Sequence, residues 1–514
     1  MKTTSDRIPE FKAGKMGVAM LIVVTSLIAV AALIVLLLPR RPTVEPRQTL
    51  LVYCAAGIKP PVEAVAREYE KEFGVSIQLQ FGGSGTLLSN LRVAHAGDLF
   101  IAGDDSYIRE GQALGVIAEA IPLAKVHPVI LVGAGNPKHI QAVSDLLRED
   151  VTVSLANPEA ASIGRMTQKL MESAGMWAAL KPRAKVFKPT VNDVANDVKI
   201  GAVDAGIVWD ATARQYPKLQ IIEASTFTGA FETVTVGVVK ASRAPTEALR
   251  FARYLGARDR GLPIFAQNHY VSLDGDAWAV SPDVVFFSGA MLRPGLEKTL
   301  KEFEAREGIR ITTVYNGCGV LCAQMRAGER PDAYFSCDTS FMTSVKDLYV
   351  DPRDVVDNDL MLIVPKGNPL NIHTPADLLR PGLRVGLPHH EKSAMGNIAW
   401  KMLMALEIYD KIGANMKVES PTGDFLVNQL RTGSLDVIIA CRSNLGSVHE
   451  YLDGVKIEHP MAHMVQPYAV GKDTRYPQLM TRLRDVIVSA ESRQRFESVG
   501  FGWTYRKTPV SLPR

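Results

Sequence analysis

The sequence lacks the features that would assign it to several large protein classes. Its 514 residues include only five cysteines, too few for a fold built on disulfides. The formal net charge is +4, and no basic run with interleaved aromatic residues is present, so we expect no nucleic-acid partner. Gly-x-Ser-x-Gly, Walker-type Gly-Lys-Ser/Thr and His-Glu-x-x-His motifs are absent. We therefore expect no enzymatic activity and no cofactor.

A long hydrophobic run occurs near the N-terminus. Residues 16–38 hold no charged residue, and a helix rising ~1.5 Å per residue would cross a bilayer over that length. Ala29-Val30-Ala31 could serve as a signal-peptide cleavage site, but the apolar run continues beyond it. Cys54 comes too late for a lipoprotein attachment site. We predict a cytoplasmic tail (residues 1–15), an uncleaved transmembrane anchor (16–38) and a short Pro/Arg linker (39–48), with cleavage as the alternative.

The remaining chain repeats itself. Residues 82–86 match residues 316–320, and residues 61–70 match residues 295–304, both at an offset of 234. Further along, Gly135-Asn136-Pro137 matches Gly367-Asn368-Pro369 at an offset of 232. This period is far too long for a solenoid repeat and indicates a duplicated domain. We predict module 1 at residues 49–273, a turn-rich linker at 274–283 and module 2 at residues 284–506.

Strand-like and helix-like segments alternate within module 1. This order is typical of an α/β fold, and we expect a parallel sheet covered on both faces. The expected strands are 49–55, 75–81, 98–102, 129–132, 151–155 and 205–208. The expected helices are 60–73, 87–94, 164–174, 191–200, 247–255 and a last short helix that ends at Asn268.

Three loops of small residues each lead directly into a predicted helix. They are residues 55–57, 82–85 and 161–163. Such loops leave backbone N–H groups unpaired at the positive ends of helices, where oxyanions bind. Any one of these loops is more often a simple turn, because Gly and Ser favour turns. Together they indicate an anion-binding cleft.

Five segments, in order, carry a family resemblance. They are Val52–Gly57, Phe81–Leu87, Gly97–Asp104, Asn157–Glu159 and Gly206–Trp209. Over about residues 50–272 they resemble the molybdate/tungstate-type (ModA-like) periplasmic substrate-binding proteins of ABC importers. The resemblance implies two tandem periplasmic-binding-protein type II modules, each with two α/β lobes and a ligand cleft. It places ligand contacts in module 1 at Gly57, Ser84, Ile163, Val191 and Trp209.

Two of these positions depart from the family pattern. The family usually has a hydroxyl residue where Gly57 stands and Tyr where Trp209 stands, and the indole N–H can only donate. Trp209 is either a ligand contact or a packed core aromatic. No Lys or Arg falls on the five positions, so the expected pocket offers hydrogen-bond donors alone. Such a pocket suits a deprotonated tetrahedral dianion and rejects phosphate that carries a proton, because a buried acceptor or donor without a partner costs ~1–3 kcal/mol.

Module 2 resembles the same family more weakly. Its equivalent positions are Met291, Cys318, Met395, Gly423 and Cys441. Three interpretations of its cysteines stay open. They act as small buried hydrophobes, they form a disulfide such as Cys318–Cys322 or Cys337–Cys441, or they hold a soft metal. The metal set would be Cys318, Cys337 and Cys441, with Met291, Met395, His389 or His390 in reach. A thiol donates weakly, so this cleft should bind an oxyanion poorly.

These observations predict a solute-binding protein rather than an enzyme. We expect a single-pass protein of the cytoplasmic membrane, held through residues 16–38, with the bulk of the chain on the periplasmic or extracellular side. It would capture molybdate or tungstate and deliver it to the permease of an ABC importer. The alternatives are a receptor for sulfate or another anion, and a membrane-tethered sensor whose clefts report ligand occupancy to a partner.

Overall fold

The structure, a computed structural model, describes residues 49–446 and 448–506. The predicted tail, anchor and linker lie outside the described residues. Within the described ranges, no helix combines the length and the apolar character that a membrane crossing requires.

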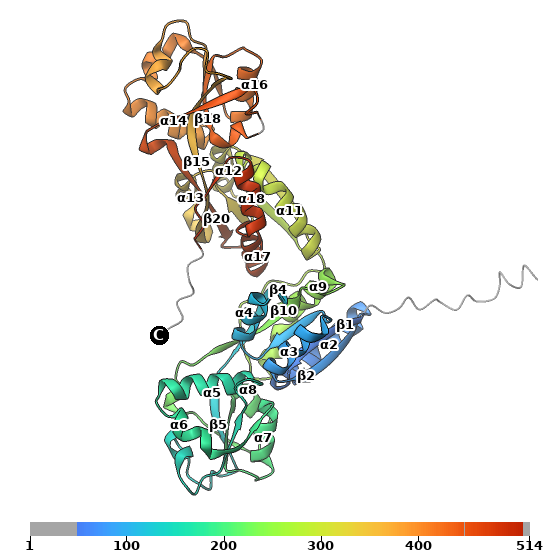
Figure 1. The fold of residues 1–514 in the computed structure, drawn as a ribbon. Helices are drawn as coiled ribbons and strands as arrows, with labels where there is room; N and C mark the ends of the chain where they lie inside the picture. The colour runs from blue at the N-terminus through green and yellow to red at the C-terminus, as the bar shows by residue number, and fades with distance from the viewer. Residues whose placement is uncertain (1–48, 447, 507–514) are drawn as a thin grey trace, which may run out of the picture. The chain divides into compact units, whose positions relative to one another are not determined.

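Module 1 folds into two lobes, each built on its own sheet (Figure 1). Lobe 1A has six strands in the order β11-β4-β10-β3-β1-β2, and lobe 1B has five in the order β7-β6-β8-β5-β9. Lobe 1A contains β1 (Thr49–Ala55), α2 (Lys59–Phe73), β2 (Ser76–Gly82), α3 (Ser84–Ala94), β3 (Leu99–Ala102), α4 (Asp105–Ala113), β4 (Ile117–Val126), β10 (Glu232–Val239), α9 (Pro245–Leu255), α10 (Gly261–Gln267) and β11 (Val271–Ser272). Lobe 1B contains β5 (Pro128–Val132), β6 (Val153–Ala156), α5 (Ser162–Ser173), α6 (Trp177–Leu180), β7 (Ala184–Lys188), α7 (Val191–Lys199), β8 (Ala205–Trp209), α8 (Asp210–Ala213) and β9 (Gln220–Ile222).

Module 2 repeats this order, except that one strand runs through both of its lobes. β15 (Tyr349–Pro365) pairs with β20 in lobe 2A and with β18 in lobe 2B, which joins the sheets into one of ten strands. Lobe 2A contains β12 (Asp283–Gly289), α11 (Arg293–Glu307), β13 (Arg310–Asn316), α12 (Cys318–Arg326), β14 (Ala333–Phe335), α13 (Thr339–Ser344), β20 (His463–Gly471), α17 (Pro477–Ile487), α18 (Ala490–Ser498) and β21 (Gly502–Trp503). Lobe 2B contains β16 (Val385–Pro388), α14 (Ala394–Ala405), α15 (Tyr409–Ile412), β17 (Met416–Ser420), α16 (Gly423–Arg431), β18 (Val437–Cys441) and β19 (Leu452–Lys456).

The first long helix of each module shows why the repeat is visible in the sequence. α2 has Pro in its first turn, buries a stripe that includes Val62, Val65 and Tyr69, and ends at Gly74 with φ of 71°. α11 also has Pro in its first turn and ends at Gly308 with φ of 65°. Proline suits the first helical turn, and glycine accepts the left-handed conformation that ends a helix. The same start signal (proline) and the same end signal (glycine) therefore define an equivalent helix in each module.

The expected strands and helices of module 1 are confirmed to within a few residues. The expectation of a parallel sheet is correct only in part, because β1 pairs in parallel with β2 and β3 while other pairs are antiparallel. β10 runs antiparallel to both β3 and β4, and β5 runs antiparallel to β8. The chain crosses from lobe 1A to lobe 1B after β4 and returns in β10, so the outgoing and returning strands point in opposite directions. Hydrophobic periodicity does not report strand direction, and the sequence analysis did not identify β4 or β10.

A cluster of buried charges joins α9, α11 and α17. The Glu307 carboxylate accepts hydrogen bonds from Arg482 at 2.7 and 3.1 Å and from Arg253 Nη1 at 3.1 Å. All three side chains are almost completely buried. Burial alone would raise the pKa of Glu307, but Arg482 and Arg253 together hold that pKa below its ordinary value.

Candidate functional site

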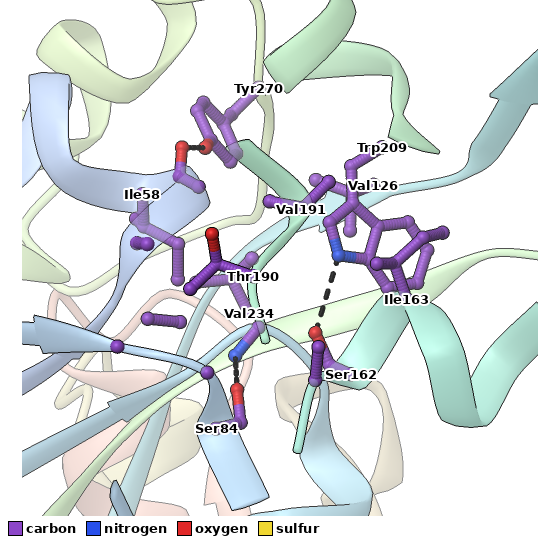
Figure 2. A pocket seen from close by; sticks show the side chains of 17 residues that line it. Ile58, Ser84, Val126, Ser162, Ile163, Thr190, Val191, Trp209, Val234 and Tyr270 are labelled. Atoms are coloured by element: carbon purple, nitrogen blue, oxygen red, sulfur yellow. Dashed lines mark hydrogen bonds between the residues drawn. The ribbon is translucent and has the colours of Figure 1, made fainter. Parts of the chain in front are cut away.

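The five predicted contacts of module 1 line one cavity between the two lobes. Its volume is about 360 Å³ including the open mouth, and its walls come from lobe 1A and lobe 1B (Figure 2). Gly57, Ser84, Ile163, Val191 and Trp209 all face it. Their role in ligand binding stays a prediction, but the structure brings together residues that are up to 152 positions apart.

Three helices begin at this cavity. α3 starts at Ser84, α5 at Ser162 and α7 at Val191, so their N-terminal backbone N–H groups converge from both lobes. The approach of the lobes explains Gly83, because a Cβ at that position would collide with the carbonyl oxygens of Ala160 and Pro189. Two of these N–H groups are already used across the gap, since Gly85 N and Thr86 N donate to Ala160 O at 2.9 and 3.4 Å. The cavity walls therefore present backbone N–H donors from both lobes when the two lobes are in contact.

The Ser84 hydroxyl accepts a hydrogen bond from Gly103, which directs its own proton elsewhere. Its Oγ accepts a hydrogen bond from the Gly103 backbone N–H at 3.1 Å, and the side chain is 1% exposed (Figure 2). An oxygen that accepts in this way keeps its own O–H for another acceptor. Among the described residues no acceptor for that proton is recorded, so the Ser84 hydroxyl can donate into the cavity.

Trp209 positions a second serine of the cavity wall, Ser162. Its indole N–H donates to Ser162 Oγ at 3.3 Å, and both side chains are buried (Figure 2). The Ser162 proton is thereby left to donate, as at Ser84. Trp209 is a packed aromatic that also lines the cavity, and its contact with a ligand stays a prediction. Sequence reasoning missed Ser162 as a donor, although its hydroxyl at the start of a helix after a small-residue loop was a usable signal.

The glycine at position 57 leaves room for neighbouring side chains. A Cβ on Gly57 would lie 2.8 Å from Val191 Cγ1 and 2.9 Å from Thr212 Oγ1. The Thr212 hydroxyl is fully buried and has no hydrogen-bond partner among the described residues. The Gly57 carbonyl accepts from the Tyr270 hydroxyl at 2.8 Å, and burial raises the pKa of Tyr270, which keeps that donor protonated. Thr212 and Val191 of the other lobe therefore fill the space that a side chain at position 57 would need.

The cavity contains no charged side chain. No Lys, Arg, Asp or Glu lines it. Asp104 lies next to the lining residue Gly103 but turns away to cap α4, where its Oδ1 accepts from Ser106 N at 2.7 Å. Burial raises the pKa of Asp104. An anion in this cavity would therefore meet neutral hydrogen-bond donors and helix N-termini, and no Lys or Arg side chain.

A second set of contacts holds the lobes of module 1 together beside the cavity. The Arg165 guanidinium of α5 lies 3.6 Å from the centroid of the Tyr107 ring on α4, and its Nη1 is 3.0 Å from Glu110. The Tyr107 hydroxyl also donates to Pro158 O at 3.3 Å. In module 2 the equivalent positions hold Phe341, Ser344 and Asn397, which carry no charge. This latch is therefore a feature of module 1.

The second cleft has a larger cavity of about 470 Å³, again including its mouth. Of the predicted positions, Met291, Met395, Gly423 and Cys441 line it, together with Cys337. Cys318 does not, because it is buried in a disulfide with Cys337. The suggested pairings Cys318–Cys322 and Cys337–Cys441 are therefore wrong. Cys322 and Cys441 are buried free thiols, and burial raises the pKa of Cys441.

The disulfide also excludes the metal set proposed from the sequence. A disulfide has no thiolate, so Cys318 and Cys337 cannot join Cys441 as thiolate ligands in this state. His389 and His390 stack on each other with ring centroids 5.4 Å apart and do not line the cavity. They were named because their loop was expected near the cleft, and their side chains pack outside it.

The two clefts differ by paired exchanges. Gly57 and Val191 in module 1 correspond to Met291 and Gly423 in module 2, so a large side chain enters where its partner becomes glycine. In module 1, a Cβ at Gly103 would collide with Ser162 Oγ. In module 2, Cys337 stands at the position of Gly103 and Ala394 at that of Ser162. The exchanges keep each cleft packed, and the change from Ser162 to Ala394 removes one hydroxyl donor from the second.

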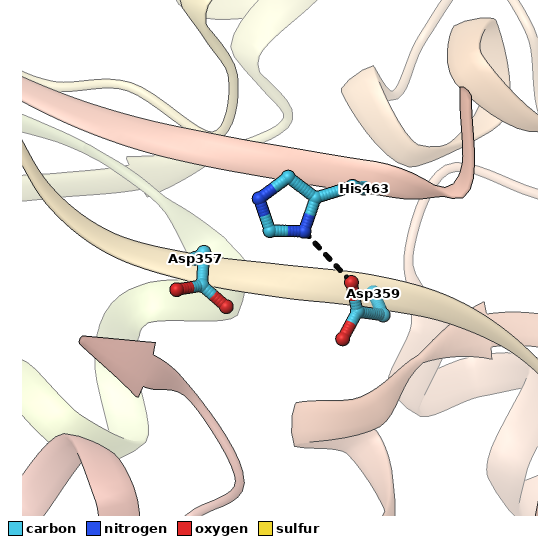
Figure 3. Close-up of side chains that lie close together, drawn as sticks. All are labelled: Asp357, Asp359 and His463. Carbon is cyan, nitrogen blue, oxygen red and sulfur yellow. Dashed lines mark hydrogen bonds and ion pairs between the residues drawn. The ribbon is translucent and has the colours of Figure 1, made fainter. Parts of the chain in front are cut away.

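Charged residues on the crossover strands are exchanged as well. In module 2, Asp357 and Asp359 of β15 lie beside His463 of β20, and the ligand atoms of all three lie within 4.8 Å of one another (Figure 3). Arg442, directly after Cys441, donates to Asp359 at 2.8 Å and to Asp357 at 3.4 Å. This guanidinium pairs with both carboxylates, so the cluster forms an ion-paired clamp on the crossover strands.

The equivalent contact in module 1 has its acidic residue at the other of the two positions. His127 and Asp210 occupy the positions of Asp359 and Arg442, with His127 Nδ1 3.4 Å from Asp210 Oδ2. In both modules the clamp follows directly after a residue that lines the cleft, Trp209 or Cys441. Both modules therefore have a polar contact between the loop after the cleft residue and the crossover strand, but different residue types form it.

Two lobes joined by crossover strands, with a donor-lined cavity between them, define a two-lobed binding module. The model of the family described as bacterial extracellular solute-binding protein matches residues 50–271 and again residues 284–502. The chain therefore belongs to the bacterial extracellular solute-binding proteins and is a ModA-like protein with two modules.

Individual relatives each correspond to about one module. The molybdate-binding protein ModA of Mycobacterium tuberculosis is 25% identical over 222 residues, which is 43% of this chain and 83% of the relative. A binding protein of Haemophilus influenzae is 27% identical over 200 residues, 39% of this chain and 81% of the relative. Among solved structures, the periplasmic molybdate-binding protein of Azotobacter vinelandii aligns over its full length with 44% of this chain, at 17% identity and a TM-score of 0.39.

Proposed function

We propose that module 1 captures a fully deprotonated tetrahedral oxyanion, molybdate or tungstate, for the permease of an ABC importer. The observation that carries this proposal is a cavity with convergent donors and no charged lining. Two serine hydroxyls, each fixed by a hydrogen bond that it accepts, remain able to donate. Helix N-termini complete the set.

The absence of a cation favours a dianion whose every oxygen accepts. Molybdate and tungstate carry no proton near neutral pH, whereas phosphate often does. A phosphate O–H in this cavity would face donors, and a buried donor without a partner costs ~1–3 kcal/mol. Sulfate has the same hydrogen-bonding character as molybdate and is smaller, so discrimination between these two depends on cavity size.

The similarity to molybdate-binding relatives supports the same ligand class. Anchoring through residues 16–38, an extracytoplasmic location for the two modules and delivery to a membrane permease belong to this proposal. Module 2 has lost the two donating serines and is proposed not to take part in oxyanion capture. The protein would thus carry one oxyanion site per chain.

Isothermal titration calorimetry tests the ligand. The full-length chain, purified in detergent, is titrated with molybdate, tungstate, sulfate and phosphate in separate experiments at pH 7. We expect one molybdate or tungstate site per chain, weaker binding of sulfate and none of phosphate. Binding of phosphate alone, or two equal molybdate sites, would contradict the proposal.

A matched pair of variants locates the site. Ser84→Asp puts a carboxylate into the cavity and should abolish oxyanion binding by charge repulsion. Ser89→Asp makes the same change on the exposed face of the same helix, α3, and should leave affinity unchanged. Equal loss of binding in both variants would show that the helix, and not the cavity, was disturbed.

A further inference from the structure

We propose that the second cleft is a site for a soft monovalent metal ion, Cu(I) or Ag(I), held by the thioethers of Met291 and Met395 and the thiol of Cys441. The three residues line one cavity between lobes 2A and 2B. Met291 comes from lobe 2A, and Met395 and Cys441 come from lobe 2B. The site is separate from the oxyanion cavity of module 1 and does not depend on the function proposed for it.

The two serine hydroxyls and the indole N–H of the first cleft have been replaced by sulfur or removed. Cys441 stands where Trp209 donates its indole N–H, and Ala394 stands where Ser162 accepts it. Met291 stands at Gly57, and Met395 at Ile163. Sulfur ligands of this kind select Cu(I) and related soft ions over hard cations.

The packing places these three residues in the cavity wall. Met291 contacts three hydrophobic clusters of module 2, one in lobe 2B and two in lobe 2A, so its side chain bridges the lobes. Met395 is 5% exposed and Cys441 is 1% exposed. Across the cavity, a Cβ on Gly423 would lie 2.5 Å from Asn444 Oδ1, so the Asn444 side chain takes the place next to Gly423. Met395 and Cys441 therefore form the buried part of the cavity wall.

The charge at the cleft favours a cation. No Lys or Arg lines the cavity, and the Asp424 carboxylate does. Asn444 holds this carboxylate in place by donating to Asp424 Oδ1 at 3.0 Å, while Asn444 Oδ1 accepts from Cys441 N at 3.1 Å. Asn192 stands at the position of Asp424 in module 1. The second cleft has thus gained a negative charge at the position where the first is neutral.

The disulfide limits the chemistry to these three sulfurs. Because Cys318 and Cys337 are oxidised, Cys441 is the one thiol at the cavity wall in the described residues. Binding breaks the Cys441 S–H bond and forms a metal–sulfur bond, and the proton leaves to solvent. The two thioethers bind without losing a proton, and no redox change is needed.

Silver nitrate in chloride-free buffer is the probe. The full-length chain, with its disulfide intact, is titrated with Ag(I) by calorimetry, and the retained silver is counted by mass spectrometry after desalting. We expect one retained Ag(I) per chain and no retained Mg²⁺, Ca²⁺ or Zn²⁺. Removing an outer partner of a metal ligand already costs about 10–100-fold in affinity, so Cys441→Ser should cost at least about a hundredfold.

Isosteric variants and matched controls separate the site from the fold. Met291→Leu and Met395→Leu keep side-chain volume and should each lower Ag(I) affinity at least about tenfold. Cys322→Ser and Cys54→Ser remove the other two buried thiols and should retain the ion. Tungstate binding measured on the same samples reports module 1 independently, and should not change in any variant. Retention of Ag(I) in both methionine variants, equal loss in Cys322→Ser, or no retained silver at all would overturn the proposal.

Discussion

Cys318 and Cys337 are joined by a disulfide at the two positions where module 1 has a hydrogen bond from Gly103 N to Ser84 Oγ. The hydrogen bond itself survives, because Cys337 N lies 3.0 Å from Cys318 Sγ. Duplication therefore converted a contact that positions a donor into a covalent link. The same backbone geometry now withdraws the side chain at position 318 from the cavity.

The disulfide should stabilise module 2 without affecting oxyanion binding. It closes a loop of 19 residues, and loops of this size are worth about 3 kcal/mol in the chain-entropy model. The double variant Cys318→Ser/Cys337→Ser should lower the unfolding temperature of module 2 in calorimetry and leave tungstate affinity unchanged. Peptide mapping of the unreduced protein should recover Cys318 and Cys337 in one linked peptide. Recovery of Cys337 linked to Cys441 would contradict the structure.

Ser162 should contribute more to oxyanion affinity than the tryptophan that orients it. A hydrogen bond to a charged group is worth about 1.5–3 kcal/mol, so Ser162→Ala should weaken tungstate binding roughly tenfold to a hundredfold. Trp209→Phe removes the indole N–H but leaves the serine, and should cost less. Calorimetric titration measures both. A larger loss in Trp209→Phe than in Ser162→Ala would indicate that the indole contacts the ligand itself.

The Arg165 latch should influence how long the ligand stays bound. Arg165→Met removes the ion pair to Glu110 and the stacking on Tyr107, so the closed form of module 1 becomes less favoured. A stacked guanidinium contributes about 0.5–2 kcal/mol, which predicts up to roughly thirtyfold faster dissociation in stopped-flow measurements. Arg92→Met, on the exposed side of α3, is the control and should dissociate at the parental rate. Identical rates in both variants would show that the latch has no role in closure.

Glu307 should make stability depend on acid. Its folded-state pKa lies below the ordinary value near 4.3 because Arg482 and Arg253 favour the carboxylate. The stabilisation is therefore present above that ordinary value and is lost as pH falls through the lower folded-state pKa. Glu307→Gln leaves two buried guanidinium groups without a counter-charge, which costs about 3–5 kcal/mol at pH 7, and this difference should shrink below pH 4.

Denaturant unfolding at several pH values measures the Glu307 effect. Glu297→Gln on the same helix, α11, removes an exposed partner of Arg293 and serves as the control with little expected change. A Glu307→Gln penalty that is constant from pH 7 to pH 3 would show that its carboxylate does not titrate as described.

Internal repetition made most of the fold predictable. α2 and α11 have the same proline start and glycine end, so one helix could be checked against the other. Strand direction could not be obtained in this way, because β4 and β10 bury residues in patterns that parallel strands also show. The sheets were therefore expected to be parallel and are mixed.

The candidate site was predictable in position but not in its hydrogen bonds. Five residues named from the family pattern line one cavity. Ser162 and Thr212 were not named, because their importance depends on the groups that Trp209 and Gly57 face across the gap. The Cys318–Cys337 pairing was missed for a related reason. A separation of 19 residues says little about proximity, although the equivalence with Ser84 and Gly103 would have revealed it once the contact in module 1 was known.

The paired residue differences between the two clefts limit how one cleft could evolve into the other. A methionine at Gly57 would strike Val191 and Thr212, and a cysteine at Gly103 would strike Ser162. Each larger side chain fits only after a neighbouring side chain has become smaller. A change from one cleft to the other by single substitutions would therefore pass through a variant with a cavity or a steric clash in its core. Once the copies had diverged at these pairs, single mutations could no longer readily convert one cleft into the other, and the chain was left with two different clefts to maintain.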